Sequence, residues 1–342
     1  MNVLPHRRLD FDDVLINPII SSVGSRSDVD TSVKIVKQHE ARSWSHTFNS
    51  PIVIANMDAT GTKAMAEAIG DNATVAFHKF SHNNLLKYWP EHFYSMGTTA
   101  ADISKLHEFV PLSAGTTYGK YPNLICIDVA NAYTQKNIDA ISSIVDTCRD
   151  SIIMAGNVAT SEGADRLFEA GVDIVKVGIG PGSVCETRSV TGVGVPQLSA
   201  ILGCAYSAEK HNKYICADGG CRTPGDVAKA LGAGADLVMI GGMFAGTDEC
   251  EGEWYQAGTP GQVTFGKKKF KFYGMASKEA QEKHYGELKN YRSSEGRSDW
   301  VDAKGPAKDV LNHILGGIRS AMTYTNSKNL AEFRQNCQFI EI

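Results

Sequence analysis

The sequence lacks the features that mark membrane, secreted and nucleic-acid-binding proteins. No apolar run is long enough to span a bilayer, and residues 1–8 do not contain the apolar segment of a signal peptide. Charge is nearly balanced, with 34 basic and 38 acidic residues. The only basic cluster, Lys267-Lys268-Lys269, is interpreted as a solvated loop. We therefore expect a cytoplasmic protein that binds neither a membrane nor nucleic acid.

The sequence also lacks paired cysteines. Its eight cysteines are scattered, and no two of them have the C-x-x-C spacing of zinc sites and redox motifs. Small secreted proteins use dense cysteine frameworks instead, and this chain has none. We therefore expect neither a structural zinc site nor a disulfide framework, which suits a reducing cytoplasm.

What the chain does contain is a regular alternation of short apolar runs with amphipathic stretches of helical length. Residues 170–178 match residues 233–241, which is an internal repeat spanning about two β-α units. Eight units in series favour an α/β fold, a (β/α)8 TIM barrel, with an open doubly wound sheet as the alternative. The expected strands are Ile52–Ala55, Thr74–Phe77, His92–Met96, Leu124–Ile127, Ile152–Ala155, Ile174–Val177, Tyr214–Ala217 and Leu237–Ile240.

Two segments fall outside this alternation. Residues 1–50 form an N-terminal arm, irregular except for a possible hairpin around residues 33–37. Residues 247–305 follow the eighth expected strand, and their first part, 247–273, is polar and has no apolar period. A long insertion at the mouth of a barrel is usually a lid or a binding loop. We therefore predict one barrel domain over residues 1–342, with an arm, a lid and no inserted regulatory domain.

The most distinctive stretch is residues 176–188, where a buried strand breaks into a glycine-rich loop that presents Cys185. Gly178, Gly180 and Gly182 allow left-handed turns and a close approach of the backbone to a ligand or ion. Backbone donors around a thiol favour the thiolate, which is the nucleophilic form. The loop therefore favours a nucleophile over the alternative, a buried structural cysteine.

Polar residues and glycines also follow the other expected strands, at the end where the active site of a barrel lies. Asp218-Gly219-Gly220 and Gly241-Gly242 offer backbone amides to a phosphate group, and Asp218 offers a carboxylate to ribose hydroxyls. A structural carboxylate that caps a turn is the alternative for Asp218. The carbonyls of Gly180, Gly182 and Cys185 share one loop and are candidate ligands for a monovalent cation, since they lack the charge that divalent ions prefer.

Together these segments resemble the IMP dehydrogenase/GMP reductase family, over nearly the whole chain from residue 9 to residue 320. The resemblance is carried by Gly180-Pro-Gly-Ser-Val-Cys-Glu-Thr-Arg188, Pro196-Gln197, Ala217-Asp-Gly-Gly-Cys221, Gly241-Gly-Met243 and Phe272-Tyr-Gly-Met275. The cysteine loop is highly specific to this family.

Within the family, four features favour the reductases over the dehydrogenases. The chain has no room for the regulatory domain that most dehydrogenases carry, and residues 25–29 and 55–58 look like the reductase versions. The Arg-Tyr pair that activates water in dehydrogenases does not occur. In its place, Tyr291-Arg-Ser-Ser-Glu-Gly296 resembles the reductase motif with an acidic catalytic residue. Glu186, Val195 and Ala276 depart from the family's usual threonine, tyrosine and serine.

The resemblance implies reduction of GMP to IMP and ammonia by NADPH. Cys185 would be the nucleophile that forms a covalent thioimidate, with Thr187 and Glu295 as its proton relay. On residues alone, Glu295 is also consistent with a surface carboxylate of the lid. An IMP dehydrogenase without its regulatory domain and a catalytically silent nucleotide-binding barrel stay open as alternatives.

The resemblance also implies the binding residues. The nucleotide would be bound by Ser183, Asp218, Gly219, Gly220, Gly241, Gly242, Met275, Ser277, Arg292 and Ser293. The cofactor would face Lys79, Asp128, Val129, Ala130, Ser320 and Tyr324, with Ser25 and Arg26 reaching the cofactor of a neighbouring subunit in a homotetramer. Lys79 and Arg26 are equally consistent with solvated surface residues. K⁺ would be held by Gly180, Gly182, Cys185, Thr187 and Arg188.

Overall fold

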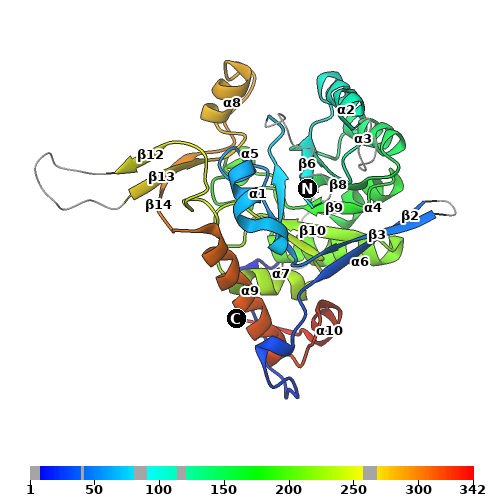
Figure 1. Cartoon of the computed structure of the whole chain (residues 1–342), viewed down its shortest axis with the longest axis vertical. Coiled ribbons are helices and arrows are strands. Elements are labelled where there is room, and N and C mark those ends of the chain that lie inside the picture. The colour runs from blue at the N-terminus through cyan, green and yellow to red at the C-terminus, as the bar shows by residue number, and fades with distance from the viewer. Residues whose placement is uncertain (1–7, 40–41, 81–90, 114–120, 257–267) are drawn as a thin grey trace, which may run out of the picture.

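The computed structural model describes residues 8–39, 42–80, 91–113, 121–256 and 268–342. At its centre lies a closed barrel of parallel strands in the order β10-β11-β4-β5-β6-β7-β8-β9 (Figure 1). The strands are β4 (Ile52–Ile54), β5 (Thr74–Phe77), β6 (Phe93–Met96), β7 (Leu124–Asp128), β8 (Ile152–Val158), β9 (Ile174–Val177), β10 (Tyr214–Asp218) and β11 (Leu237–Ile240). The eight predicted strands are confirmed, and the closure between β11 and β4 excludes the open sheet.

Helices surround the barrel and connect its strands. They are α1 (Lys63–Ile69), α2 (Ala100–Ser113), α3 (Gln135–Thr147), α4 (Ser161–Glu169), α6 (Gln197–His211), α7 (Pro224–Gly232) and α9 (Ala307–Tyr324). Helix α7 begins as its sequence predicts: the Thr223 side chain accepts from the Asp226 amide, Asp226 completes a capping box, and Pro224 occupies the first turn. No helix in these described ranges is long and apolar enough to cross a membrane.

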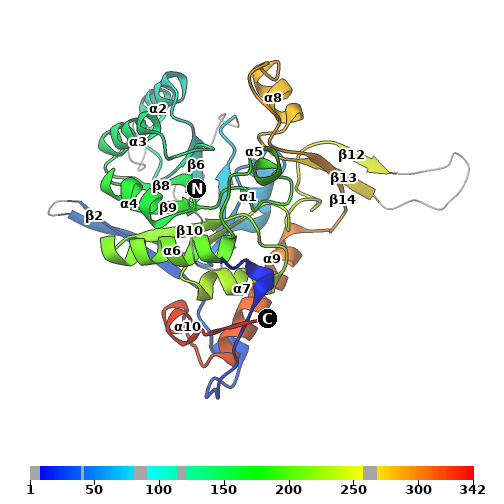
Figure 2. The ribbon, with the colours of Figure 1, turned by 180° about the vertical axis from the view of Figure 1, so that it is seen from behind.

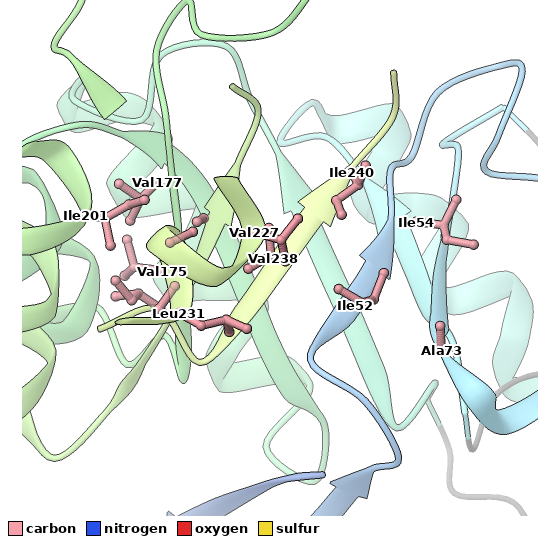
Figure 3. Close-up of a cluster of buried hydrophobic side chains, with 14 of the residues drawn as sticks. Ile52, Ile54, Ala73, Val175, Val177, Ile201, Val227, Leu231, Val238 and Ile240 are labelled. Atoms are coloured by element: carbon pink, nitrogen blue, oxygen red, sulfur yellow. The ribbon is translucent and has the colours of Figure 1, made fainter. Parts of the chain in front are cut away.

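Alternation along the strands divides the core into two layers. Ile52 and Ile54 point outward from β4 into a cluster shared with the surrounding helices, to which α6 contributes Ile201 and α7 contributes Val227 (Figure 3). Val53, between them, belongs instead to the cluster that fills the barrel. Strands buried on both faces read as continuous apolar runs, and this is why the sequence predicts them well.

The N-terminal arm is more regular than its sequence indicates. Strands β2 (Val33–His39) and β3 (Arg42–Phe48) form the antiparallel hairpin that was predicted, extending beyond residues 33–37 (Figure 2). The hairpin contacts the barrel through Lys37 of β2, whose ammonium donates to Asp173 at 2.9 Å, and both side chains are buried. Strand β1 (Val14–Ile16), which was not predicted, pairs with β15 (Phe339–Glu341), just after α10 (Leu330–Asn336).

The lid contains a small antiparallel sheet, so the prediction that residues 247–273 lack a regular pattern is wrong. Strands β12 (Trp254–Gln256), β13 (Lys268–Tyr273) and β14 (Ser298–Asp302) form the sheet, which projects from the barrel, and α8 (Lys278–Tyr285) follows β13 (Figure 1). In β13, Phe270 and Phe272 alternate with lysines and are buried.

The predicted basic loop is therefore part of a strand. Lys267 lies outside the described residues. The Lys268 ammonium lies 3.9 Å from the centre of the Trp254 ring, and Lys269 pairs with Asp302 at 3.9 Å. Both side chains have partners within the lid.

Burial of His92 gives the fold a sensitivity to acid. Its Nδ1 accepts a hydrogen bond from the Val75 amide at 3.2 Å, which requires an unprotonated nitrogen. Burial, assisted by the charge of His46, lowers the pKa of His92 from 6.5 to about 4. Below pH 6.5, His92 is therefore protonated in the unfolded chain but not in the folded chain, and the stability of the fold decreases as the pH approaches 4.

We expect the contribution of His92 to the free energy of unfolding to fall by about 1.4 kcal/mol per pH unit between pH 6.5 and 4. His92→Gln keeps an acceptor for the Val75 amide but does not titrate, so the variant should show a shallower dependence. Urea denaturation of both proteins at pH 7.5 and 5 measures the difference. Equal losses of stability in the two proteins would contradict this account.

Candidate active site

Three predicted catalytic residues meet where the cysteine loop touches the lid. The Cys185 thiol lies 3.3 Å from the Thr187 hydroxyl, which donates to a carboxylate oxygen of Glu295 at 2.8 Å. Thr187 begins the short helix α5 (Thr187–Thr191), and Glu295 comes from the lid, 108 residues later. The arrangement is a continuous hydrogen-bonded path from a sulfur atom to a carboxylate, which is suited to proton transfer.

The lid reaches the cysteine loop through the backbone. The Glu186 amide donates to the Glu295 carbonyl at 2.7 Å, and the Arg297 amide donates to the Val184 carbonyl at 3.0 Å. Gly274 is necessary at this crossing, because a Cβ atom there would lie 2.7 Å from the Val184 carbonyl oxygen. Glu295 is thus fixed beside Thr187 by main-chain bonds as well as by its side chain.

Cys185 differs from the buried cysteines in its surroundings. It is partly exposed, whereas Cys126, Cys204 and Cys216 are fully buried. Burial raises the pKa of the Cys126 and Cys204 thiols to about 12, and it also raises the pKa of Cys216. These buried thiols stay protonated near neutral pH and are structural cysteines.

A buried ion triad that was not predicted lies at the carboxyl ends of β7, β9 and β10. The Lys176 ammonium donates to Asp128 at 2.7 Å and to Asp218 at 2.6 Å, and the lysine side chain is 3% exposed. Burial alone would lower the pKa of Lys176, but the two carboxylates raise it well above its usual value. Burial likewise opposes ionisation of Asp128, and Lys176 reverses this, so the pKa of Asp128 is lowered. A lysine inside an apolar strand was the signal in the sequence.

Asp218 is part of the structural framework. The oxygen that accepts from Lys176 also accepts from the Asn157 side-chain amide at 2.9 Å, so the alternative of a structural carboxylate describes part of its role. Gly219 and Gly220 follow with φ values of +86° and +89°, a conformation that favours glycine. Buried Gln197 donates to the Val177 carbonyl at 2.9 Å and to the Asp218 carbonyl at 3.3 Å, linking the ends of two strands.

The remaining predicted nucleotide residues divide into two groups. Ser183 lies over Gly242, where a Cβ atom would be 2.8 Å from its hydroxyl, and Gly241 immediately precedes that glycine. On the lid, Met275 lines a cavity, while buried Ser277 uses its hydroxyl to cap α8. Arg292 and Ser293 are exposed, with the Arg292 guanidinium donating to Gln281 at 3.4 Å.

The predicted cofactor residues also form two groups. Lys79 and Asp128 line one cavity together with Asn56, Phe80 and several lid residues, and Val129 and Ala130 follow Asp128 directly. Arg26 lines another cavity, with Ser27, Val29, Gly316 and Arg319, where the arm packs on α9. Ser25 caps the 3₁₀ turn that carries Arg26, while Ser320 and Tyr324 lie on α9 itself. Within one chain the two groups line different cavities.

A cluster around Asp58, also missed from the sequence, joins the lid to the barrel. The buried Asp58 carboxylate accepts from His284 at 2.7 Å, from Tyr273 at 2.7 Å and pairs with Lys283 at 2.9 Å. Burial opposes ionisation, but these three partners lower the pKa of Asp58 below its usual value. Burial lowers the pKa of neighbouring His78 to about 4, although Asp58 opposes this, so His78 is neutral near pH 7.

The predicted cation loop is held by Arg188. Its guanidinium donates to the Val195 carbonyl at 2.6 Å and the Ile179 carbonyl at 3.4 Å, and pairs with Asp10 at 3.3 Å. The Gly182 carbonyl accepts from the Cys185 amide at 3.0 Å. Across the described ranges, no group of three or more His, Cys, Asp or Glu side chains is placed to hold a metal ion. A set of neutral carbonyls in this loop fits a monovalent ion better than a divalent one.

Comparisons with known proteins agree in sequence and in fold. A family model described as the IMP dehydrogenase / GMP reductase domain matches residues 117–342. The chain is 41% identical over 355 residues to a GMP reductase of Serratia proteamaculans (strain 568), covering 100% of this chain and 97% of the relative. It is 41% identical over 345 residues to a GMP reductase of Yersinia enterocolitica, covering 98% and 95%.

A solved structure has the same fold. A GMP reductase variant from Trypanosoma brucei, in complex with guanosine 5'-monophosphate, matches with a TM-score of 0.82 at 23% identity. The match covers 98% of this chain and 96% of that one. This likeness shows that the barrel, arm and lid together form a known architecture.

The contrast among the thiols predicts selective labelling. At pH 7.5, iodoacetamide should modify Cys185 before the buried cysteines, because a buried thiol of raised pKa is both inaccessible and protonated. Peptide mass spectrometry at early times gives the order of modification. In Cys185→Ala the early adduct should disappear, whereas first labelling at Cys126 or Cys204 would contradict the assignment.

Removing the ammonium of the triad should destabilise the protein strongly. Lys176→Met removes the buried ammonium that Asp128 and Asp218 share, at an expected cost of about 3–5 kcal/mol in the free energy of unfolding. Lys176→Arg, which keeps the charge, should recover part of this loss. Lys210→Met is the matched control, because Lys210 pairs with Asp165 at 3.6 Å in an exposed position. Chemical denaturation compares the three variants, and a Lys176→Met loss no larger than that of the control would argue against the triad.

Proposed function

Because the chain belongs to the IMP dehydrogenase/GMP reductase family, we propose that it catalyses the NADPH-dependent reductive deamination of GMP to IMP and ammonia. The observation that carries this proposal is the path from the Cys185 thiol through the Thr187 hydroxyl to the Glu295 carboxylate. The exocyclic amino group of guanine is a poor leaving group until it is protonated, and this path offers a proton next to the nucleophile.

The alternative reaction in the family, oxidation of IMP, has less support. It needs a group that activates water, and no Arg-Tyr pair occurs in the sequence. Instead, an acidic residue hydrogen-bonds to Thr187. The full-length relatives at 41% identity are also named GMP reductases. These three observations favour the reductase over a dehydrogenase without its regulatory domain.

In the proposed reaction, the Cys185 thiolate attacks C2 of the guanine ring, and a carbon–sulfur bond forms. Glu295, which receives the Cys185 thiol proton through Thr187, passes it back through Thr187 to the exocyclic nitrogen, the C2–N bond breaks, and ammonia leaves a covalent thioimidate. One proton from solvent replaces the transferred proton in each turnover. NADPH, when bound, supplies hydride to C2. The carbon–sulfur bond then breaks with its electron pair returning to sulfur, which regenerates the Cys185 thiolate and gives IMP.

We assign the surrounding residues by the same proposal. Asp218, fixed by Lys176 and Asn157, would face the ribose, and the amides of Gly219, Gly220, Gly241 and Gly242 with Ser183 would face the phosphate. Met275, Ser277, Arg292 and Ser293 would cover the nucleotide from the lid. The cavity containing Lys79 and Asp128 would take the nicotinamide portion of NADPH.

A neighbouring subunit would complete the cofactor site. Within one chain, the cavity of Lys79 is separate from the cavity that is lined or flanked by Ser25, Arg26, Ser320 and Tyr324. An arm that crosses to a neighbour in a homotetramer would bring the two groups of residues to one cofactor. K⁺ would lie in the cysteine loop among the carbonyls of Gly180, Gly182 and Cys185, with Thr187 and Arg188 beside it. A cation there would help hold the loop that carries the nucleophile.

The three departures from the family pattern leave the site's framework intact, because each residue contributes a backbone contact. The Glu186 amide donates to the Glu295 carbonyl, and the Glu295 amide donates to the Ala276 carbonyl at 3.2 Å. The Val195 carbonyl accepts from Arg188 at 2.6 Å. None of these bonds depends on the identity of the side chain, so a silent nucleotide-binding barrel is not needed to explain the substitutions.

The proposal is tested by following the loss of reduced-cofactor absorbance with GMP, NADPH and a potassium salt. We expect turnover that yields IMP and ammonia, no turnover in Cys185→Ala, and a kcat lowered by about 100- to 10,000-fold in Glu295→Gln. Glu287→Gln, a lid carboxylate paired with Lys289 in solvent, is the matched control and should resemble the parent.

Other outcomes would redirect the assignment. Reduction of NAD⁺ with IMP, without turnover of GMP, would place the chain among the dehydrogenases. Tight GMP binding without turnover in either direction would leave a silent nucleotide-binding protein. A Glu295→Gln variant that reacts as fast as the parent would remove the carboxylate from the relay.

A further inference from the structure

The buried Asp58 carboxylate anchors helix α8 of the lid to the mouth of the barrel. Asp58 follows β4, and its side chain is 3% exposed. Two of its partners, Lys283 and His284, are consecutive residues of α8, and the third, Tyr273, ends β13 of the lid. One carboxylate of the barrel therefore binds two consecutive elements of the lid, β13 and α8.

The anchored helix also forms a wall of the cavity that contains Lys79 and Asp128. Gln281, His284 and Tyr285 line it from α8, opposite the barrel residues. His284 belongs to both structures, because its Nε2 contacts Asp58 while its ring stacks on Phe80 with centroids 3.7 Å apart and planes 6° apart. Phe80 comes from the barrel side of the same cavity, so this stack closes the wall.

The proton relay is attached to the barrel independently of this anchor. Glu295 is held by the Glu186 amide and the Thr187 hydroxyl, and Arg297 is held by the Val184 carbonyl. None of these contacts includes Asp58 or α8. Loosening α8 should therefore change the cavity without displacing the catalytic carboxylate.

We propose that Asp58 and His284 are positioning residues that set the affinity for the reduced cofactor by holding α8 against its cavity. This inference rests on the proposed function, in which NADPH occupies that cavity. The groups facing Asp58 are His284 and Lys283 from α8, Tyr273 from β13 and His78 after β5. The lowered pKa of Asp58 agrees with a carboxylate that stays ionised and attracts the lid near neutral pH.

Steady-state kinetics with NADPH varied at saturating GMP tests the proposal. In Asp58→Asn, which loses charge-assisted bonds to the lid, KM for NADPH should rise about 10- to 100-fold. The kcat at saturating NADPH should stay within about twofold of the parent, because Glu295 has its own attachments. The dissociation constant of GMP alone, measured by calorimetry, should not change.

Two substitutions at His284 separate its contacts. His284→Phe keeps a ring to stack on Phe80 but loses the bond to Asp58, and His284→Gln keeps a donor to Asp58 but loses the ring. Each should raise KM for NADPH by less than Asp58→Asn, since Lys283 and Tyr273 still bind the carboxylate. Glu282→Gln is the matched control on the same helix, because its pair with Lys278 is exposed.

The outcomes distinguish this inference from the proposed function. If the parent enzyme turns over GMP but Asp58→Asn and both His284 variants match Glu282→Gln in KM for NADPH, the positioning role is wrong and the reductase assignment stands. If the His284 variants retain the parental melting temperature but lose kcat and GMP affinity equally, the Asp58–His284 pair acts on the relay or the nucleotide site instead. A parent without GMP turnover would overturn the proposed function, and the positioning role with it.

Discussion

The buried Lys176 ammonium is the interaction on which the barrel mouth depends. From a position on β9, it joins Asp128 at the end of β7 to Asp218 at the end of β10, so three strand ends share one positive charge. Burial opposes ionisation of Asp128, and the Lys176 ammonium reverses this, so that the pKa of Asp128 is lowered. Asn157 and Gln197 extend the network to the ends of neighbouring strands. The glycine loops that follow these strand ends are thereby fixed in position.

The lid is attached to the barrel mouth at two places that differ in chemistry. Near Cys185 the attachment is made by the main chain, and Gly274 permits the close approach. Near Asp58 it is made by the side chains of Lys283 and His284 around one carboxylate. Backbone bonds fix a reacting group closely, whereas a side-chain attachment can be weakened without unfolding the sheet. Under the proposed function, the two attachments would let catalysis and cofactor binding depend on different residues.

The sequence predicted the barrel well because its strands are buried on both faces and read as uninterrupted apolar runs. It predicted the cysteine loop because glycine, proline and cysteine have strong local meaning. The lid sheet was missed, since in Lys268–Tyr273 lysines occupy alternate positions and only Phe270 and Phe272 face inward. The Asp58–His284 contact was beyond local reasoning, because 226 residues separate its partners. Lys176 was visible but had no partner until the fold placed two carboxylates beside it.

The pairing of β1 with β15 has a consequence for the order of events during synthesis. The arm begins at the start of the chain, but its first strand pairs with residues 339–341, and the ring closes only when β11 meets β4. Such contacts of long sequence separation form slowly and wait for distant segments. Strand β1 can therefore pair only after residues 339–341 have been synthesised, and the barrel can close only after β11 has been synthesised. Until β11 is present, the edge of β4 with which it pairs stays open, and an open strand edge is a place where aggregation can begin.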